Sequence, residues 1–365
     1  MNLLFFIHNM TGGGAERVMS IIANEFAKNG HNVTLAITEQ NPVIVYHLDP
    51  LIQVTALRGK YPKASKSLFN KVVRHTMDLF LPLRMRMLAK KTSAEYVVSF
   101  ITEFNIEVLR AFKGSKYPVI VSEHTNVTRK IDPKINELRN KFYPYAAAVT
   151  VLTQRDFLLW QDKFPNVVLL PNPCTPTDVN INQERRKVVF TAGRVRNWEV
   201  KGYDNLIKAW SLICHKFPDW HLEIAGDYTE RSLEQLNDII RKCNAINVRF
   251  LGFREDVNQL MATSEVYCLS SRVEGLPMSL LEAMSAGCCC VAFDCITGPS
   301  DIIMNGINGL LAKDQDVDDL AAKLEMTMAD EAYRRTLSKN NGKSLNKFSL
   351  SVITNKWINL FKTAK

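Results

Sequence analysis

The sequence predicts an α/β protein of two domains, each a parallel β-sheet flanked by helices. The chain has 365 residues, more than one hydrophobic core usually serves. Short apolar runs alternate with amphipathic helical patterns, as they do in parallel sheets. This alternation starts twice, on either side of a polar, proline-containing stretch. We expect a first domain at 1–171, a linker at 172–187, a second domain at 188–346, and a final segment at 347–365.

The first series of strands is expected at 2–10, 32–37, 96–100, 118–123, 147–152 and 166–173. Between the first two strands, the glycine run Gly12–Gly14 opens a helical pattern that turns Ile22 and Phe26 inward. This helix is expected to end at Asn29, because glycine follows it and readily terminates a helix.

The second series of strands is expected at 187–195, 221–226, 248–253, 266–271, 289–293 and 309–312, with helices at 203–217, 232–243, 279–286 and 317–328. An amphipathic helix at 348–365 is expected to pack back on the first domain. Two such sheets facing each other leave a cleft at the carboxyl ends of their strands, where α/β folds bind ligands.

The formal net charge of +9 lies entirely in the first half of the chain. Residues 1–171 hold 22 Lys and Arg against 13 Asp and Glu, whereas the remainder holds 24 of each. Residues 58–91 carry ten basic side chains and one acid, Asp78, with apolar side chains between them. Such a stretch predicts contact with an anionic membrane surface, and a solvated helix face fits it equally well. We expect no nucleic-acid partner, because no aromatic RNA-binding signature or helix-turn-helix pattern is present.

The cysteines and acidic triplets raise the question of a metal. All eight cysteines lie at or beyond Cys174, and without a leader segment we expect a cytoplasmic protein with reduced thiols. Cys288–Cys290 begin an apolar run that predicts a buried strand, where cysteine behaves as a small hydrophobe. Two D-x-D triplets at 314–318 precede a helical pattern, and helix capping explains them. We therefore expect no metal cofactor.

Charged residues gather at the predicted ends of two strands in the second half. Arg194 and Lys201 follow the first of these strands, where two cations suit a diphosphate. Glu274 and Glu282 bracket a Gly-Leu-Pro turn and the start of a helix, whose amides can meet an oxygen-rich ligand. A carboxylate there can accept hydrogen bonds from both ribose hydroxyls. Surface pairing, helix capping and, for Gly12–Gly14, a simple tight turn are the alternatives for each feature alone.

Together these motifs resemble the retaining glycosyltransferases of family 4, which have two Rossmann-like domains facing each other across a cleft (the GT-B fold). "GGGAERV" at 12–18 resembles the glycine loop of the family, "SEHTN" at 122–126 carries its histidine, and "LPNPC" at 170–174 matches its hinge. "GR…KG" at 193–202 is similar to the diphosphate pair, and "EGLPMSLLEAMSAG" at 274–287 to the donor motif. "DCITGPSDII" at 294–303 resembles galactosyl- and N-acetylhexosaminyltransferases of bacterial surface polysaccharides and N-acetylgalactosamine polymerases of bacterial N-glycan assembly.

The resemblance implies roles for the matching residues. Those implied in catalysis are His124, Arg194, Lys201 and Glu274. Those implied in donor binding are Gly12, Gly13, Gly14, Asn172, Arg194, Lys201, Phe253, Glu274, Gly275, Leu276, Pro277 and Glu282. The two cations would neutralise the departing diphosphate, while Glu282 would bind the ribose and Glu274 the transferred sugar. His124 would lie near the anomeric carbon, and Phe253 would border the uracil.

The resemblance also implies a reaction and partners. The enzyme would move a hexose or N-acetylhexosamine from UDP-Gal, UDP-GalNAc or UDP-GlcNAc to a polyprenyl-diphosphate-linked glycan at the inner face of the cell membrane. O-antigen, capsule, exopolysaccharide or another surface glycan would be the product. A nucleotide-sugar epimerase of the same two-domain fold and a non-catalytic glycolipid-binding protein remain alternatives. An NAD-dependent dehydrogenase would need a spaced glycine fingerprint that the sequence does not show convincingly.

Overall fold

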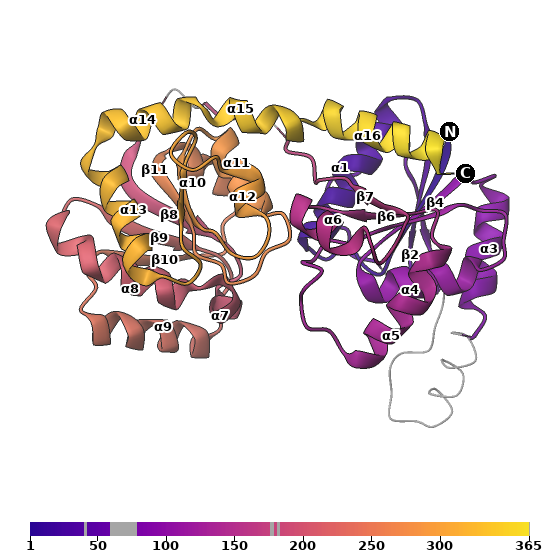
Figure 1. Ribbon diagram of the computed structural model, residues 1–365, viewed down its shortest axis with the longest axis horizontal. Helices are drawn as coiled ribbons and strands as arrows, with labels where there is room; N and C mark the ends of the chain where they lie inside the picture. The colour runs from indigo at the N-terminus through magenta and orange to yellow at the C-terminus, as the bar shows by residue number, and fades with distance from the viewer. Residues whose placement is uncertain (40–41, 59–78, 176–178, 181–182, 365) are drawn as a thin grey trace. The chain divides into compact units, whose positions relative to one another are not determined.

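The computed structural model describes residues 1–39, 42–58, 79–175, 179–180 and 183–364. They form two compact units, Met1–Pro173 with Leu350–Lys365, and Cys174–Ser349 (Figure 1). The first strand of the second unit begins at Arg186, inside the stretch expected as a linker. Residues 59–78 of the basic stretch, and 176–178 and 181–182 of the expected linker, lie outside the described residues.

The first unit is built on a seven-stranded parallel sheet. Its strands are β1 (Asn2–Ile7), β2 (Asn32–Ile37), β3 (Gln53–Ala56), β4 (Tyr96–Phe100), β5 (Val119–Ser122), β6 (Ala148–Val151) and β7 (Val167–Leu169). They lie in the order β3-β2-β1-β4-β5-β6-β7, so the order reverses between β1 and β4. Strand β3 was not predicted, because it is a short edge strand of four residues, none of them buried.

Helices flank this sheet (Figure 1). They are α1 (Gly14–Lys28), α3 (Leu81–Lys91), α4 (Thr102–Phe112), α5 (Pro133–Phe142), α6 (Gln154–Trp160) and α16 (Leu350–Thr363), with a 3-10 turn at Tyr143–Tyr145. The C-terminal helix α16 packs on this unit, as predicted. The ring of Phe361 lies 5.6 Å from that of Phe26 in α1 and 4.8 Å from that of Tyr96 in β4.

The second unit holds a six-stranded parallel sheet. Its strands are β8 (Arg186–Ala192), β9 (His221–Ala225), β10 (Val248–Gly252), β11 (Ser264–Leu269), β12 (Cys289–Phe293) and β13 (Leu310–Ala312). Their order, β10-β9-β8-β11-β12-β13, again reverses between the two central strands, here β8 and β11. Both sheets therefore have the Rossmann-like arrangement that the sequence predicts.

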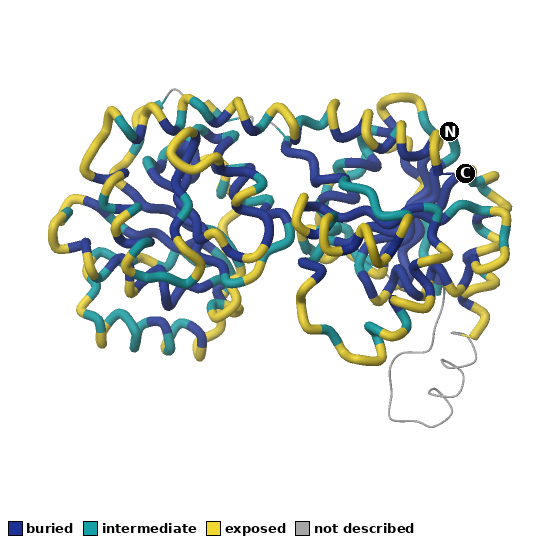
Figure 2. The backbone as a smooth tube through the Cα atoms, in the orientation of Figure 1, coloured by how far each residue is buried: buried dark blue, intermediate teal, exposed yellow. Residues whose placement is uncertain are grey.

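The helices of the second unit bury their apolar faces on this sheet, which forms the dark core of the unit in Figure 2. They are α7 (Trp198–Lys201), α8 (Tyr203–Ile213), α9 (Glu230–Cys243), α10 (Val257–Ala262), α11 (Met278–Ser285), α12 (Pro299–Ile302), α13 (Val317–Ala329), α14 (Glu331–Lys339) and α15 (Asn341–Leu345), with 3-10 turns at Val195–Asn197, Cys214–Lys216 and Asn346–Phe348. Among the helices described in both units, none combines the length and apolarity that a membrane span requires.

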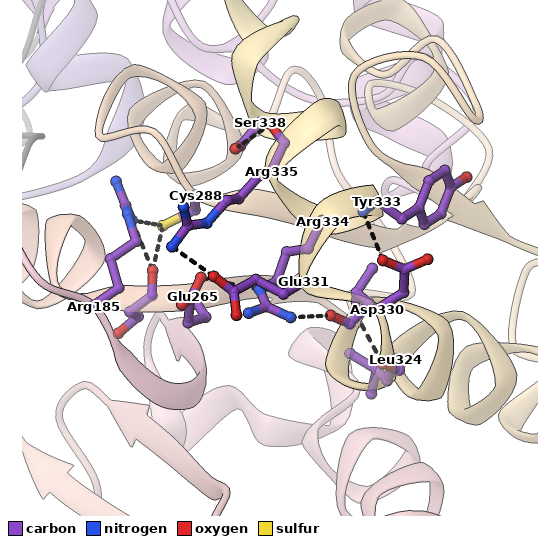
Figure 3. A network of polar contacts seen from close by, with 12 residues as sticks. Arg185, Glu265, Cys288, Leu324, Asp330, Glu331, Tyr333, Arg334, Arg335 and Ser338 are labelled. Carbon is purple, nitrogen blue, oxygen red and sulfur yellow. Dashed lines mark hydrogen bonds and ion pairs between the residues drawn. The ribbon is translucent and has the colours of Figure 1, made fainter.

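Two arginines anchor the amino end of β11 (Figure 3). The Nε of Arg334 donates to the carboxylate of Glu265 at 3.0 Å. Arg185 donates to the carbonyl oxygens of Ser264 and Ala286, each at 2.7 Å. Cys288 lies beside Arg185, and burial raises the pKa of its thiol to about 12, so the sulfur stays protonated. These charge-assisted hydrogen bonds make this end of the sheet a structural anchor.

Candidate functional site

An ion pair joins the loops that follow the two central strands of the second sheet. Lys201 lies at the end of α7, after β8, and Glu274 lies after β11. The Nζ of Lys201 is 2.8 Å from Oε1 of Glu274, and the two side chains are 28% and 13% exposed. Because both charges are largely withdrawn from water, they attract each other more strongly than a surface pair does. The pair lies at the switch point of the sheet, where α/β folds bind ligands.

Close backbone contact holds these two loops together. Gly202 has a φ of 63°, and a Cβ at this position would lie 1.9 Å from the carbonyl oxygen of Ser270. Only glycine therefore allows the backbones to approach this closely. The hydroxyl of Ser270 in turn donates to the carbonyl oxygen of Lys201 at 2.9 Å. The cation is thus fixed to the loop that carries its carboxylate partner.

Arg272 adds a second connection between the same loops. Its guanidinium donates two hydrogen bonds of 2.8 Å to the carboxylate of Asp204 in α8, and another to the carbonyl oxygen of Glu199 in α7. Burial by itself would raise the pKa of Asp204, but the hydrogen bonds from Arg272 and the positive charges of Arg272 and Lys208 together outweigh it, so this pKa is lowered. Arg272 was not predicted as a site residue, because nothing in its position along the sequence distinguishes it from an ordinary surface arginine.

The loop of Glu274 rests on the segment that precedes α12. The hydroxyl of Thr297 donates to the carbonyl oxygen of Glu274 at 2.6 Å. Gly298 has a φ of 100°, and a Cβ there would lie 2.3 Å from the carbonyl oxygen of Gly275. Two residues of the "DCITGPSDII" motif therefore support this loop through a hydrogen bond and a close backbone approach.

The other candidates of the second unit lie at or near the carboxyl edge of its sheet. Leu276 and Pro277 are buried, and Pro277 is the N-cap of α11, whose first turn receives no side-chain cap. Glu282 is half-buried within α11. Arg194 is exposed directly after β8, and Phe253 is largely exposed after β10. Of all the candidates, the described contacts join Lys201 and Glu274 directly.

In the first unit, the glycine loop Gly12–Gly14 connects β1 to α1. The hydroxyl of Tyr46 donates to the carbonyl oxygen of Gly13 at 3.0 Å. The carboxylate of Glu16 folds back over this position, since a Cβ on Gly13 would lie 2.0 Å from Oε2 of Glu16. A carboxylate is stabilised at a helix N-terminus. Glu16 therefore lies beside the first turn of α1, where its negative charge is favourable.

His124 follows the carboxyl end of β5. Its ring stacks on Phe100 with centroids 4.2 Å apart, and its Nε2 lies 3.1 Å from the hydroxyl oxygen of Ser122. Burial lowers the pKa of His124 to about 3, so the ring is neutral at pH 7 although part of its surface remains exposed. Asn172, the remaining candidate of this unit, is buried just before the chain enters the second unit.

A buried polar network lies beside His124. The carboxyl group of Glu123 accepts hydrogen bonds from the hydroxyls of Tyr143 and Thr102. Burial raises the pKa of Glu123, against the opposing effect of these bonds. Ile101 has a φ of 77° and a ψ of 127°, a strained conformation for a β-branched residue. The sequence analysis missed this network, because buried polar residues on different strands share no spacing along the chain.

Comparison with known proteins identifies the family. Residues 12–176 match Glycosyltransferase Family 4, and residues 177–344 match Glycosyl transferases group 1. The sequence is 30% identical over 370 residues to the Campylobacter jejuni GalNAc-alpha-(1->4)-GalNAc-alpha-(1->3)-diNAcBac-PP-undecaprenol alpha-1,4-N-acetyl-D-galactosaminyltransferase, covering 100% of this chain and 99% of that relative. The chain belongs to glycosyltransferase family 4.

Two further similarities extend over nearly the whole of this glycosyltransferase. The amylovoran biosynthesis glycosyltransferase AmsD of Erwinia amylovora is 26% identical, over 97% of this chain and 98% of its own. The crystal structure of HepE from Anabaena in complex with UDP matches with a TM-score of 0.79 at 17% identity, over 100% of both chains. The structural similarity confirms the predicted GT-B fold.

Proposed function

We propose that this glycosyltransferase moves a hexose or N-acetylhexosamine, with retention of configuration, from UDP-Gal, UDP-GalNAc or UDP-GlcNAc to a hydroxyl of a polyprenyl-diphosphate-linked glycan. The observation that carries the proposal is the Lys201–Glu274 pair at the switch point of the second sheet. The activity of the Campylobacter relative supports a lipid-linked acceptor, and the UDP bound to the Anabaena structure supports a uridine nucleotide.

Both members of the pair have a use in this reaction. Breaking the sugar–phosphate bond leaves negative charge on the diphosphate, so a fixed cation stabilises the transition state more than the ground state. In the free protein, Glu274 holds Lys201 in place. When the donor binds, the diphosphate takes over Lys201, and the hydroxyls of the sugar take over Glu274. Each buried charge therefore exchanges one partner for another, which limits the cost of breaking the pair.

Retention follows in this proposal from attack of the acceptor hydroxyl on the face that the diphosphate leaves. A phosphate oxygen of the leaving group takes the proton of the acceptor hydroxyl. Glu274 then acts as a ligand for sugar hydroxyls and not as a covalent nucleophile. In the donor complex, hydrogen bonds from those hydroxyls would weaken this carboxylate as a nucleophile.

We also infer that transfer proceeds without a divalent cation. Lys201 and Arg194 supply positive charge after β8. Of the acidic triplets, Asp316 is the N-cap of α13, and its carboxylate accepts from the amide of Asp319 at 3.0 Å. Helix capping therefore accounts for the carboxylate of Asp316 without a bound metal.

For the acceptor side, we infer that one face of α3 lies on anionic lipid at the cytoplasmic face of the membrane. Leu83 and Met87 of α3 are each more than half exposed. Their spacing of four residues places them on the same side of a helix. Lys90 and Lys91, also exposed, follow in the last turn. Exposed apolar side chains flanked by cations are the features of a helix that lies in a membrane interface.

The transfer reaction can be tested by UDP release. The purified enzyme is incubated with each of the three UDP-sugars, with and without membrane extract as a source of acceptor. We expect release that depends on the acceptor, and we expect Glu274→Ala to abolish it while the circular dichroism spectrum stays unchanged. Conversion of one UDP-sugar into another without acceptor would instead establish an epimerase. Full activity of Glu274→Ala would overturn the assignment of this residue.

Membrane contact can be tested separately, by co-sedimentation with anionic phosphatidylglycerol vesicles. We expect binding that weakens as salt is raised. Leu83→Glu combined with Met87→Glu should remove it, whereas Leu212→Glu, at an exposed leucine in α8 of the second unit, should not. Equal binding by both variants would contradict the assignment of this surface to α3.

A further inference from the structure

We propose that Thr150 and Ser122 are positioning residues that fix His124 as the neutral tautomer with its proton on Nδ1. In this state His124 is a hydrogen-bond donor to an oxygen of the sugar substrate. The identity of that substrate rests on the proposed function, whereas the tautomer does not.

The direction of the hydrogen bonds follows from counting protons. The hydroxyl oxygen of Thr150 lies 2.7 Å from that of Ser122, which lies 3.1 Å from Nε2 of His124. Thr150 and Ser122 are buried, at 0% and 2% exposure. If Nε2 carried the proton and donated to Ser122, the hydroxyl proton of either Ser122 or Thr150 would find no acceptor among the described contacts, and an unmet buried donor is costly. Thr150 therefore donates to Ser122, and Ser122 donates to Nε2.

This direction determines what the ring can offer. A nitrogen that accepts a hydrogen bond carries no proton, so the single proton of the neutral imidazole resides on Nδ1. His124 then has one donor left to present. A hydroxyl or other oxygen of a sugar is a suitable acceptor for it, whereas the guanidinium or ammonium of a neighbouring side chain is not.

The surrounding residues hold the ring and its partner still. Phe100, on which the ring of His124 stacks, packs in turn against Trp357 of α16, with centroids 6.5 Å apart. The carbonyl oxygen of Ser122 accepts hydrogen bonds from the amide of Ile101 and from Nδ2 of Asn105. Both the imidazole and the hydroxyl that orients it are thus fixed by neighbouring elements, as a positioning chain requires.

The groups around His124 keep the ring neutral. Among the described contacts, the side chains that touch the ring or the hydroxyl of Ser122 are those of Phe100 and Thr150, and neither carries a charge. The titratable groups of the adjoining network, Glu123 after β5 and Tyr143 after α5, are bonded to each other. Burial raises the pKa of both. A general acid or base needs a pKa near the working pH, and the pKa of His124 lies far below that pH. The geometry therefore favours a donor over a proton-transfer role.

The proposal can be tested by nitrogen-15 NMR of the histidine rings in the full-length protein. The signals of His124 are assigned as those that His124→Gln removes. We expect the wild type to show a protonated Nδ1 and an unprotonated Nε2 from about pH 5.5 to pH 8, the range in which free histidine titrates. Ser122→Ala should lose this single-tautomer pattern. Thr150→Val should weaken it, because the hydroxyl of Ser122 becomes free to turn away.

Ser99→Ala is the matched control. Ser99 is an equally buried serine on β4, but its hydroxyl donates to Asn105. Its removal should leave the tautomer of His124 unchanged. A protonated Nε2 in the wild type, or an unaltered pattern in Ser122→Ala, would overturn the proposal. The spectra require no catalytic turnover. They can therefore disprove the proposed tautomer of His124 without bearing on whether the protein is a transferase.

Discussion

The two sheets share the same order of strands, but the side chains at their carboxyl ends differ in charge: neutral groups dominate in the first unit and an ion pair in the second. In the first unit, burial keeps His124 neutral and raises the pKa of Glu123. In the second, Lys201 and Glu274 form an ion pair beside Asp204, whose pKa is lowered. The difference arises from the neighbouring side chains, because His124 and Glu123 contact an aromatic ring and hydroxyls, whereas Glu274 and Asp204 pair with Lys201 and Arg272. The same scaffold therefore supports a neutral hydrogen-bonding site in one unit and a charged site in the other.

The largest effect is expected from removing the cation of the charged site. Lys201→Ala should lower kcat by about 10²- to 10³-fold, the usual consequence of deleting one stabilising group for developing charge. Lys187→Ala, which breaks an exposed lysine–carboxylate pair with Asp219, should leave kcat unchanged. Both are measured by UDP release. An unchanged kcat in Lys201→Ala would show that the charged site of the second unit does not contribute to catalysis.

A smaller effect is expected when the two loops of the charged site are untied. Arg272→Ala leaves the carboxylate of Asp204 without its bidentate partner. The free energy of unfolding should fall by about 1–3 kcal/mol, the cost of an unsatisfied buried polar group. Urea denaturation measures this change. Arg241→Ala, whose exposed partner is Asp238, should have no measurable effect. Equal stability of the two variants would show that the loops do not depend on Arg272.

A third test asks whether transfer needs a divalent cation in addition to the cationic side chains of the second unit. Asp316→Ala should cost about 1 kcal/mol of stability, as loss of an N-cap does. Transfer activity should persist in that variant and in wild-type enzyme treated with EDTA. Asp330→Ala is the matched control, because Asp330 caps α14 in the same way. Loss of activity confined to Asp316→Ala, restored by added Mn²⁺, would contradict the metal-independent mechanism.

The last test concerns the neutral site, where the expected effect appears only as a pH dependence of stability. The pKa of His124 is lowered in the folded protein from its ordinary value near 6.5 to about 3. Between these values the unfolded chain binds the proton more readily, so His124 destabilises the fold increasingly as pH falls below 6.5. From pH 7 to pH 5, the wild type should lose roughly 2 kcal/mol more than His124→Gln. Thermal melts at both pH values measure the difference, and parallel losses would argue for a protonated, solvated ring.

Much of the fold could be read from local pattern. All strands except β3 were predicted, because buried parallel strands are continuous apolar runs. The loops of Lys201 and Glu274 were also identified, since glycines and charges at strand ends form a recognisable motif. The edge strand Gln53–Ala56 escaped because its residues are exposed or half-exposed. The contacts of Arg272 and Ser122 escaped because their partners lie on other elements.

The sequence by itself determined the two sheets, the glycine turns and the residue types available at each strand end, because periodicity and turn chemistry act over short distances along the chain. Only the tertiary structure decided that Lys201 bonds to Glu274 and that Ser122 lies between Thr150 and His124. These partners are brought together by strand order, and charge and proton position depend on burial and on neighbours distant in sequence.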